Sequence, residues 1–152
     1  MNKKNKDNIL AEIVKKTKLH FFRSVFKNYQ ASSLSLGDSM TLEVIEYLES
    51  PSINDLVKFL YMSQPNVSYR INILQKKGYI TKIKSMEDAR ITHIVLTDKY
   101  FSYKRKKNEL TARVLRNVED KLDKEEREYL YDNLDLVNRE LEKELREFLK
   151  WK

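Results

Sequence analysis

The chain has 152 residues, of which 41% are hydrophobic and 35% are charged, and its net charge is +7. This hydrophobic content is too high for a wholly disordered chain, and the length suits one domain with a modest core. The lack of cysteine excludes disulfide scaffolding and thiol-based sensing and fits a reducing cytoplasm, where we expect the protein. No apolar run is long enough to span a membrane, and Glu12 interrupts the run at 9–14, so we expect neither a secretory signal nor a membrane partner.

The first 60 residues carry three predicted helices. Asp7 can cap a first helix that runs to about Tyr29 and has a broad apolar face. A serine-rich linker at 31–37 separates it from a second helix that ends near Pro51. Ser52 can cap a short third helix, and the turn after it leads into the segment that carries most of the chemistry.

A fourth helix is predicted from Ser63 to Gly78. Ser63 can cap it, and Pro65 suits its first turn, where an amide would be unpaired anyway. Gly78 follows two lysines and suits a left-handed C-cap. The apolar residues recur at i, i+4 and i+7 and form one inward stripe: Val67, Ile71 and Leu74. The pattern predicts an amphipathic helix with one polar face.

The polar face of this helix carries side chains that hydrogen-bond base edges or phosphates. With the capping serine and the flanks of the apolar stripe included, the candidate DNA-binding residues are Ser63, Gln64, Asn66, Ser68, Tyr69, Arg70, Asn72 and Lys76. A solvated amphipathic helix would have the same pattern, so this helix alone does not decide between the two interpretations.

Two predicted strands follow the helix and form a hairpin. Residues 79–84 alternate apolar and polar side chains, and residues 91–96 are rich in β-branched residues. Arg90 can insert into a narrow minor groove, where the negative potential is enhanced, and Asp88 can hold its guanidinium by a charge-assisted hydrogen bond. The alternative is an exposed turn with an incidental ion pair. The candidate wing contacts are Lys82, Lys84, Asp88 and Arg90.

Four short motifs in register resemble the MarR (multiple antibiotic resistance regulator) family: SQPNVS at 63–68, KKGYI at 76–80, DAR at 88–90 and LT at 96–97. The resemblance extends from about Leu36 into the helix after Thr97. It implies a homodimeric winged helix-turn-helix transcription factor that binds pseudo-palindromic double-stranded DNA and is often released by a small ligand. Tyr69 stands where many members carry a basic residue, and Asn72 and Ile73 replace a usual acidic–basic pair. The base preference of the family therefore does not transfer.

The positive charge is concentrated around this unit. Residues 58–107 contain 12 Lys/Arg and 3 Asp/Glu, a net charge of +9, whereas residues 1–57 carry +1 and residues 108–152 carry −3. Neutralising DNA phosphates releases counterions, which favours binding. A concentration of positive charge is therefore expected in a segment that contacts DNA. A merely solubilising surface would spread its charge more evenly.

The remaining sequence predicts two more helices. Thr97 can cap a long fifth helix that runs to about Leu122, and Asp123 with Glu126 forms a capping-box-like pair at the start of the last one. The last helix has a near-heptad apolar stripe, which predicts a dimer interface: Leu130, Leu134, Val137, Leu141, Leu145 and Phe148. Packing on the chain's own core, or a free coiled coil, are the alternatives. Two half-sites require two-fold symmetry, which favours dimerisation.

The signal for a ligand site is weak. Fold analogy places six candidate lining residues between the dimerisation helices and the winged region: His20, Phe21, Tyr29, Tyr47, Tyr100 and Tyr103. Aromatic residues at helical spacing are more often core, so ordinary packing explains them equally. An effector of this site would be an apolar or aromatic organic acid. With no cysteine and two histidines far apart, we expect no metal and no cofactor.

The sequence thus predicts one mainly α domain with a small β-hairpin wing (α+β), a winged helix-turn-helix at 36–107 flanked by dimerisation helices at 1–35 and 108–152. The predicted function is that of a homodimeric repressor. The alternative is a winged-helix module that binds protein and never reads DNA. An enzyme is not expected, because the chain has only two glycines, no cysteine nucleophile and no evident Ser-His-Asp context.

Overall fold

Helices account for most of the molecule, and one antiparallel hairpin completes it. The computed structural model describes residues 3–32, 34–88 and 90–150, with side chains given for 8–24, 34–88 and 90–147. The elements in chain order are α1 (Lys3–Ser32), α2 (Leu36–Tyr47), α3 (Ile53–Leu60), α4 (Gln64–Lys76), β1 (Ile80–Lys84), β2 (Thr92–Leu96), α5 (Asp98–Glu119) and α6 (Lys124–Lys150). The predicted fold class is confirmed.

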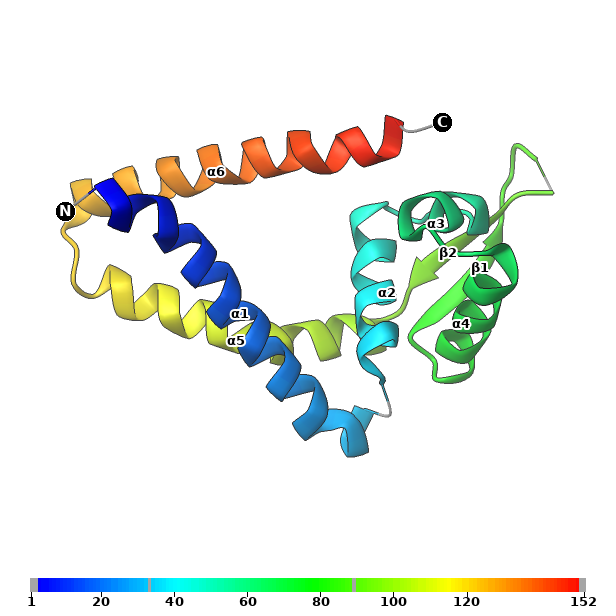
Figure 1. Cartoon of the computed structure of the whole chain (residues 1–152). Coiled ribbons are helices and arrows are strands. Elements are labelled where there is room, and N and C mark those ends of the chain that lie inside the picture. The colour runs from blue at the N-terminus through cyan, green and yellow to red at the C-terminus, as the bar shows by residue number, and fades with distance from the viewer. Residues whose placement is uncertain (1–2, 33, 89, 151–152) are drawn as a thin grey trace.

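The elements divide into a packed head and a long arm (Figure 1). Helices α2, α3 and α4 gather around the hairpin at one end of the molecule, and α5 leads away from them. Helix α1 crosses α5, and α6 runs back toward α2 and α3 (Figure 1). None of the helices within the described residues combines the length and the apolar character needed to cross a bilayer.

The core lies in the head. Its buried apolar side chains come from the segment before α2, from α2 to α4, from the hairpin and from the first turn of α5: Leu34, Leu42, Ile45, Leu56, Val67, Ile71, Leu74, Tyr79, Ile80, Ile94 and Tyr100. Among the described side chains of α1 and α6, none is fully buried. These two helices therefore depend on something other than this core to cover their apolar residues.

Capping decides where the short helices begin. Ser35 and Asp38 form a reciprocal capping box at the start of α2, and Ser52 and Asp55 form another at the start of α3. The Ser52 cap is confirmed. The predicted linker at 31–37 is wrong in extent, because α1 reaches Ser32 and the Ser35 cap already starts α2.

Several other predicted boundaries differ from the structure. Helix α1 begins at Lys3, so Asp7 lies inside it rather than at its cap. Helix α2 ends at Tyr47 instead of near Pro51, because Glu49 and Ser50 take positive φ values of 52° and 70°. Helix α5 ends at Glu119 rather than at about Leu122.

The starts of the last two helices differ in how they are capped. Asp123 and Glu126 exchange backbone-to-carboxylate hydrogen bonds of 2.9 and 3.0 Å, so the capping pair before α6 is confirmed. Thr97 occupies the N-cap of α5, but its hydroxyl donates to the carbonyl of Gly78 at 2.7 Å. Thr97 thus links the start of α5 to the end of α4.

The hairpin packs one face on the head. Strands β1 and β2 pair antiparallel, with Ile80 opposite Leu96 and Lys84 opposite Thr92. Because side chains alternate across a strand, Ile80 and Lys82 share the inner face, and Lys82 lies opposite the buried Ile94. The connection between the strands projects beyond the rest of the head (Figure 1).

Candidate nucleic-acid interface

Helix α4 is fixed by its apolar stripe. Val67, Ile71 and Leu74 are all 0% exposed, as their spacing predicts. Gly78 has a φ of 76°, and this left-handed residue ends the helix as expected. Ser63 stands at the N-cap but makes no side-chain capping hydrogen bond. The fixed stripe turns the opposite face of α4 away from the core.

That outward face presents a polar surface with one large aromatic ring. Six of the candidate side chains are exposed: Ser63, Gln64, Asn66, Tyr69, Asn72 and Lys76. Tyr69 is 68% exposed. Ser68 is half-buried on the flank. The face combines donors, acceptors and an aromatic ring, the groups that contact bases and phosphates.

Arg70 has a different position from the one its helical spacing implied. Its guanidinium lies over Gly37 in the first turn of α2, so close that a Cβ at residue 37 would be 2.2 Å from Nη1 of Arg70. The arginine therefore packs α4 against α2 through the space that Gly37 leaves open. This side chain is directed along the head rather than outward from the polar face.

A buried ion pair makes a second link between α4 and α2. Lys77, the C-cap residue of α4, donates to Oδ2 of Asp38 at 2.7 Å, and Asp38 is 5% exposed. Burial alone would raise the pKa of Asp38, but hydrogen bonds from Lys77 and Ser35 outweigh it and hold the pKa below its ordinary value. The orientation of α4 is thus secured at its C-terminal end.

The wing carries an exposed arginine on a hydrogen-bonded turn. Asp88 accepts from the backbone amide of Arg90 at 2.9 Å, and the Ser85 hydroxyl accepts from the amides of Glu87 and Asp88 at 3.2 and 3.4 Å. Asp88 therefore shapes the turn, whereas the sequence interpretation had it hold the guanidinium. Arg90 and Lys84 are exposed. Lys82 is half-buried, and its ammonium donates to Oδ1 of Asn72 on α4 at 2.8 Å.

The predicted dimer stripe on α6 lies at the surface of the single chain. Leu134, Val137, Leu141 and Leu145 are 46%, 38%, 52% and 37% exposed, and Leu130 is half-buried. The side chain of Phe148 lies outside the described residues. Helix α1 has the same character, with Ile9, Leu10, Ile13, Val14 and Leu19 between 42% and 57% exposed. Such runs of exposed apolar side chains are typical of an interface.

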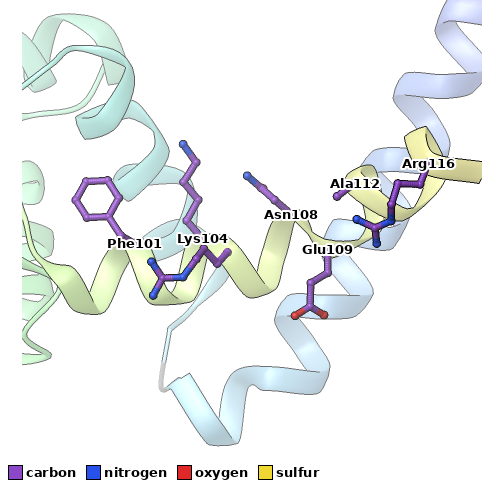
Figure 2. Close-up of a pocket in the computed structure, with 7 residues that line it drawn as sticks. Phe101, Lys104, Asn108, Glu109, Ala112 and Arg116 are labelled. Carbon is purple, nitrogen blue, oxygen red and sulfur yellow. The ribbon is translucent and has the colours of Figure 1, made fainter. Parts of the chain in front are cut away.

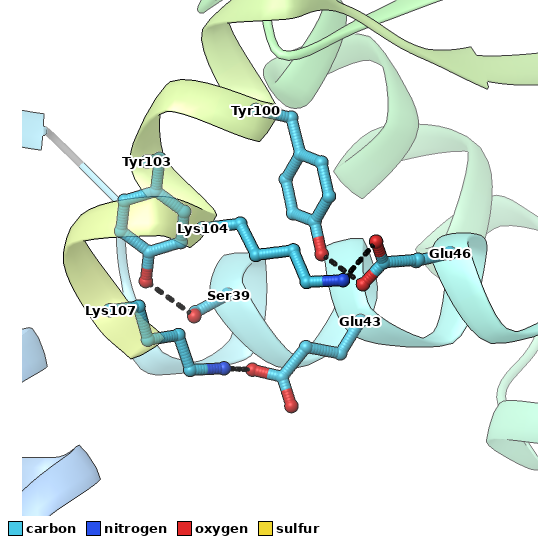
Figure 3. A network of polar contacts seen from close by, with 7 residues as sticks. All are labelled: Ser39, Glu43, Glu46, Tyr100, Tyr103, Lys104 and Lys107. Carbon is cyan, nitrogen blue, oxygen red and sulfur yellow. Dashed lines mark hydrogen bonds and ion pairs between the residues drawn. The ribbon is translucent and has the colours of Figure 1, made fainter. Parts of the chain in front are cut away.

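A network of polar contacts joins α5 to α2 (Figure 3). Tyr100 and Lys104 both donate to the carboxylate of Glu46, at 2.8 and 2.6 Å. One turn further, Tyr103 shares a 2.7 Å hydrogen bond with Ser39. Burial and the neighbouring Glu46 raise the pKa of Tyr100 well above its ordinary value. The contacts fall at helical spacing on both helices, so α5 enters the head as a packed element.

Lys107 closes this network and is the functional candidate that the sequence did not single out. Its ammonium contacts Glu43 and lies 4.3 Å from the centroid of the Phe21 ring. Burial lowers the pKa of Lys107 to about 8. A local sequence pattern could not single out Lys107, because only the fold brings α1, α2 and α5 together around it.

The predicted effector residues with described side chains line different cavities or pack in or against the core. Tyr100 is 2% exposed and belongs to the core, and Tyr103 packs on Tyr79 with ring centroids 6.1 Å apart. Tyr47 lies by Glu142 of α6, and His20 lines a cavity of about 420 Å³ between α1 and α5. The side chain of Tyr29 lies outside the described residues.

Phe21 lines a separate cavity of about 330 Å³ between α1, α2 and α5. Its walls are mainly apolar, and its charged lining residues are Lys18, Glu43 and Lys107; the full lining is Ile13, Val14, Thr17, Lys18, Phe21, Glu43 and Lys107. In the part of the chain that the structure describes, no cluster of three or more His, Asp or Glu side chains is placed to hold a metal ion.

A further hollow of about 370 Å³ lies along α5 alone (Figure 2). Its lining residues recur along one side of the helix: Phe101, Lys104, Arg105, Asn108, Glu109, Ala112 and Arg116. Because a single helix lines it, this hollow is a furrow between side chains on the arm. None of its lining residues belongs to α4 or to the hairpin.

Comparisons with known proteins agree with this arrangement. The model of the MarR family matches residues 34–92. The transcriptional regulator Tm0710 from Thermotoga maritima is 21% identical, with a TM-score of 0.70 over 95% of this chain and 99% of that one. None of the curated proteins compared with the chain is a match.

Two similar structures contain DNA. FabT of Streptococcus pneumoniae, in complex with DNA, is 22% identical, with a TM-score of 0.62 over 93% of this chain and 99% of that one. A variant of MepR from S. aureus, bound to an oligodeoxyribonucleotide, is 18% identical, with a TM-score of 0.56 over 87% and 97%. Residues 34–92 thus match the MarR family model, and the chain as a whole is similar in fold to these winged-helix structures.

Proposed function

We propose that the chain is a sequence-specific DNA-binding transcription regulator, a homodimeric repressor that acts in the cytoplasm on a pseudo-palindromic operator. The observation that carries the proposal is the exposed polar face of α4 beside a wing with an exposed Arg90, within a segment of net charge +9. Helix α4 would enter the major groove, and Arg90 the neighbouring minor groove. The DNA complexes of FabT and MepR support the same use of the fold.

The dimer in this proposal is built from residues 1–35 and 108–152. The exposed apolar runs of α1 and α6 support it, because these helices bury little against the head of their own chain. A second copy would cover both runs and place two α4 helices on successive half-sites.

Selection of duplexes from a random library, followed by fluorescence anisotropy, tests the proposal. We expect one enriched pseudo-palindrome. Each subunit has three exposed cations in this region: Lys76, Lys84 and Arg90. A dimer should therefore make about six phosphate contacts, and the logarithm of its binding constant should fall with the logarithm of the salt concentration with a slope of about −5. A library without enrichment, or binding that salt does not weaken, would favour the alternative of a protein-interaction module.

We further propose that an apolar or aromatic organic acid tunes this regulator from the cavity beside Phe21. The cavity offers apolar walls for the body of the ligand and the Lys107 ammonium for its carboxylate, which would take the place of Glu43. Lysine in a partly buried site is a suitable partner because a desolvated cation attracts a carboxylate more strongly.

Thermal unfolding with benzoate and octanoate tests the ligand site. Both acids should raise the melting temperature of the wild-type protein by preferential binding to the folded state. Lys107→Met, which keeps a long apolar stem, should abolish the shift. Equal shifts in the two proteins would place the acid elsewhere and refute this assignment.

A further inference from the structure

A side-chain hydrogen bond joins the wing to the candidate reading helix. Nζ of Lys82 on β1 donates to Oδ1 of Asn72 on α4 at 2.8 Å. Lys82 shares the inner strand face with the buried Ile80 and lies opposite the buried Ile94. Its stem therefore runs along the core, and its charged end emerges beside α4.

The chemistry of the two groups fixes the orientation of the amide. An ammonium carries only donors, so the atom of Asn72 that faces it must be the oxygen. The amide nitrogen of Asn72, with its two N–H groups, then points away from Lys82. Asn72 is exposed and lies between Tyr69, one turn earlier, and Lys76, one turn later, on the outward ridge of α4.

We propose that Lys82 orients the amide of Asn72 so that its N–H groups face the major groove, and that the operator therefore carries guanine, rather than adenine, at the position that Asn72 contacts. The proposal rests on the proposed function, in which α4 enters the major groove. A free asparagine pairs with adenine by accepting from N6 and donating to N7. Because its oxygen is turned toward Lys82, Asn72 presents its two N–H groups to the groove, where guanine offers two acceptors, N7 and O6.

Selection from a random duplex library, run in parallel on wild type and Lys82→Met, tests the inference. Wild type should enrich guanine at one position of each half-site. Lys82→Met keeps the apolar stem but frees the asparagine oxygen, so the preference at that position should move toward adenine by about tenfold in relative affinity. Lys82→Arg still donates and should retain guanine.

Lys84→Met is the matched control. Lys84 is the next residue on the same strand face but is exposed, and its loss removes the same charge. It should weaken all duplexes alike and leave the selected bases unchanged. Thermal unfolding of each variant establishes that the head is intact.

The outcomes separate the inference from the function on which it rests. Failure of the wild-type protein to enrich any duplex overturns the proposed function. Enrichment with the same bases in wild type and Lys82→Met overturns the role of Lys82. If Lys82→Met binds no duplex, Asn72→Ala decides: loss of the guanine preference at one position supports the inference, and an unchanged motif overturns it.

Discussion

Two leucines on the outer stripe of α6 offer the sharpest test of the dimer. Leu134 and Leu141 lie two turns apart, and they are 46% and 52% exposed in the single chain. Changing both to glutamate leaves the core of the head untouched. If a second copy covers the stripe, the change removes apolar contact area and places four carboxylates in the interface of a symmetric dimer.

The expected loss follows from the exposure. Complete burial of a leucine contributes about 1.5–3 kcal/mol. Because each side chain is about half exposed, a partner can bury only the remaining half, about 0.8–1.5 kcal/mol per leucine. Four leucines per dimer then contribute about 3–6 kcal/mol, so the doubly substituted protein should dimerise about 100 to 10,000 times more weakly. Desolvation of the new carboxylates adds to this loss.

Sedimentation equilibrium over a range of concentrations measures the change directly. Wild type should sediment as a dimer, and Leu134→Glu/Leu141→Glu as a monomer or as partly unfolded protein. Leu136→Glu is the matched control, since Leu136 is 49% exposed but lies off the stripe on another side of α6. A folded dimer of undiminished affinity in the doubly substituted protein would show that the stripe is not the interface.

Four further predictions concern the wing, the buried lysine and the head. Arg90→Ala should weaken operator binding at least about tenfold in a gel shift and leave thermal unfolding nearly unchanged, because Arg90 is exposed; wild-type affinity would refute the wing contact. Because burial lowers the pKa of Lys107 from 10.5 to about 8, the unfolded chain binds more protons between these values, so the free energy of unfolding should rise with pH there. Lys107→Met should lose this rise, and identical pH profiles in urea titrations would contradict the burial. Leu74→Ala should cost about 2–5 kcal/mol in the same titrations, since the side chain is 0% exposed. Gly78→Ala should cost about 1 kcal/mol or more through its φ of 76°, and no cost would argue against the left-handed cap.

Local patterns sufficed to predict the head in outline. The stripe of α4, the left-handed Gly78 and the alternating strands each depend on residues within one element, so spacing alone reveals them. The same holds for the capping pairs at Ser52 and Asp123. The prediction failed at some boundaries. Between α1 and α2 the serine-rich run indicated a longer loop, but Ser35 in that run caps α2, so the connection is shorter.

Side-chain direction could not be predicted in the same way. Helical spacing places Arg70 on the flank of α4. In the structure its guanidinium lies over Gly37 of α2, where the absence of a side chain leaves room for it. Lys82 was expected among the wing contacts to DNA, whereas its partner in the structure is Asn72 of α4. Lys107 belongs to a lysine-rich run, and only the crossing of α1 and α5 gives it an apolar cavity. Each of these contacts joins segments far apart in the chain.

Helix α2 contacts both the arm and α4. Toward α5 it presents Ser39, Glu43 and Glu46 to the network of Figure 3. Toward α4 it holds Lys77 through the buried Asp38. A ligand carboxylate that displaced Glu43 from Lys107 would release one contact of the first set and leave the second set intact. In the proposed dimer, a shift of α2 against α5 would reach α4 through Asp38 and change the spacing of the two α4 helices.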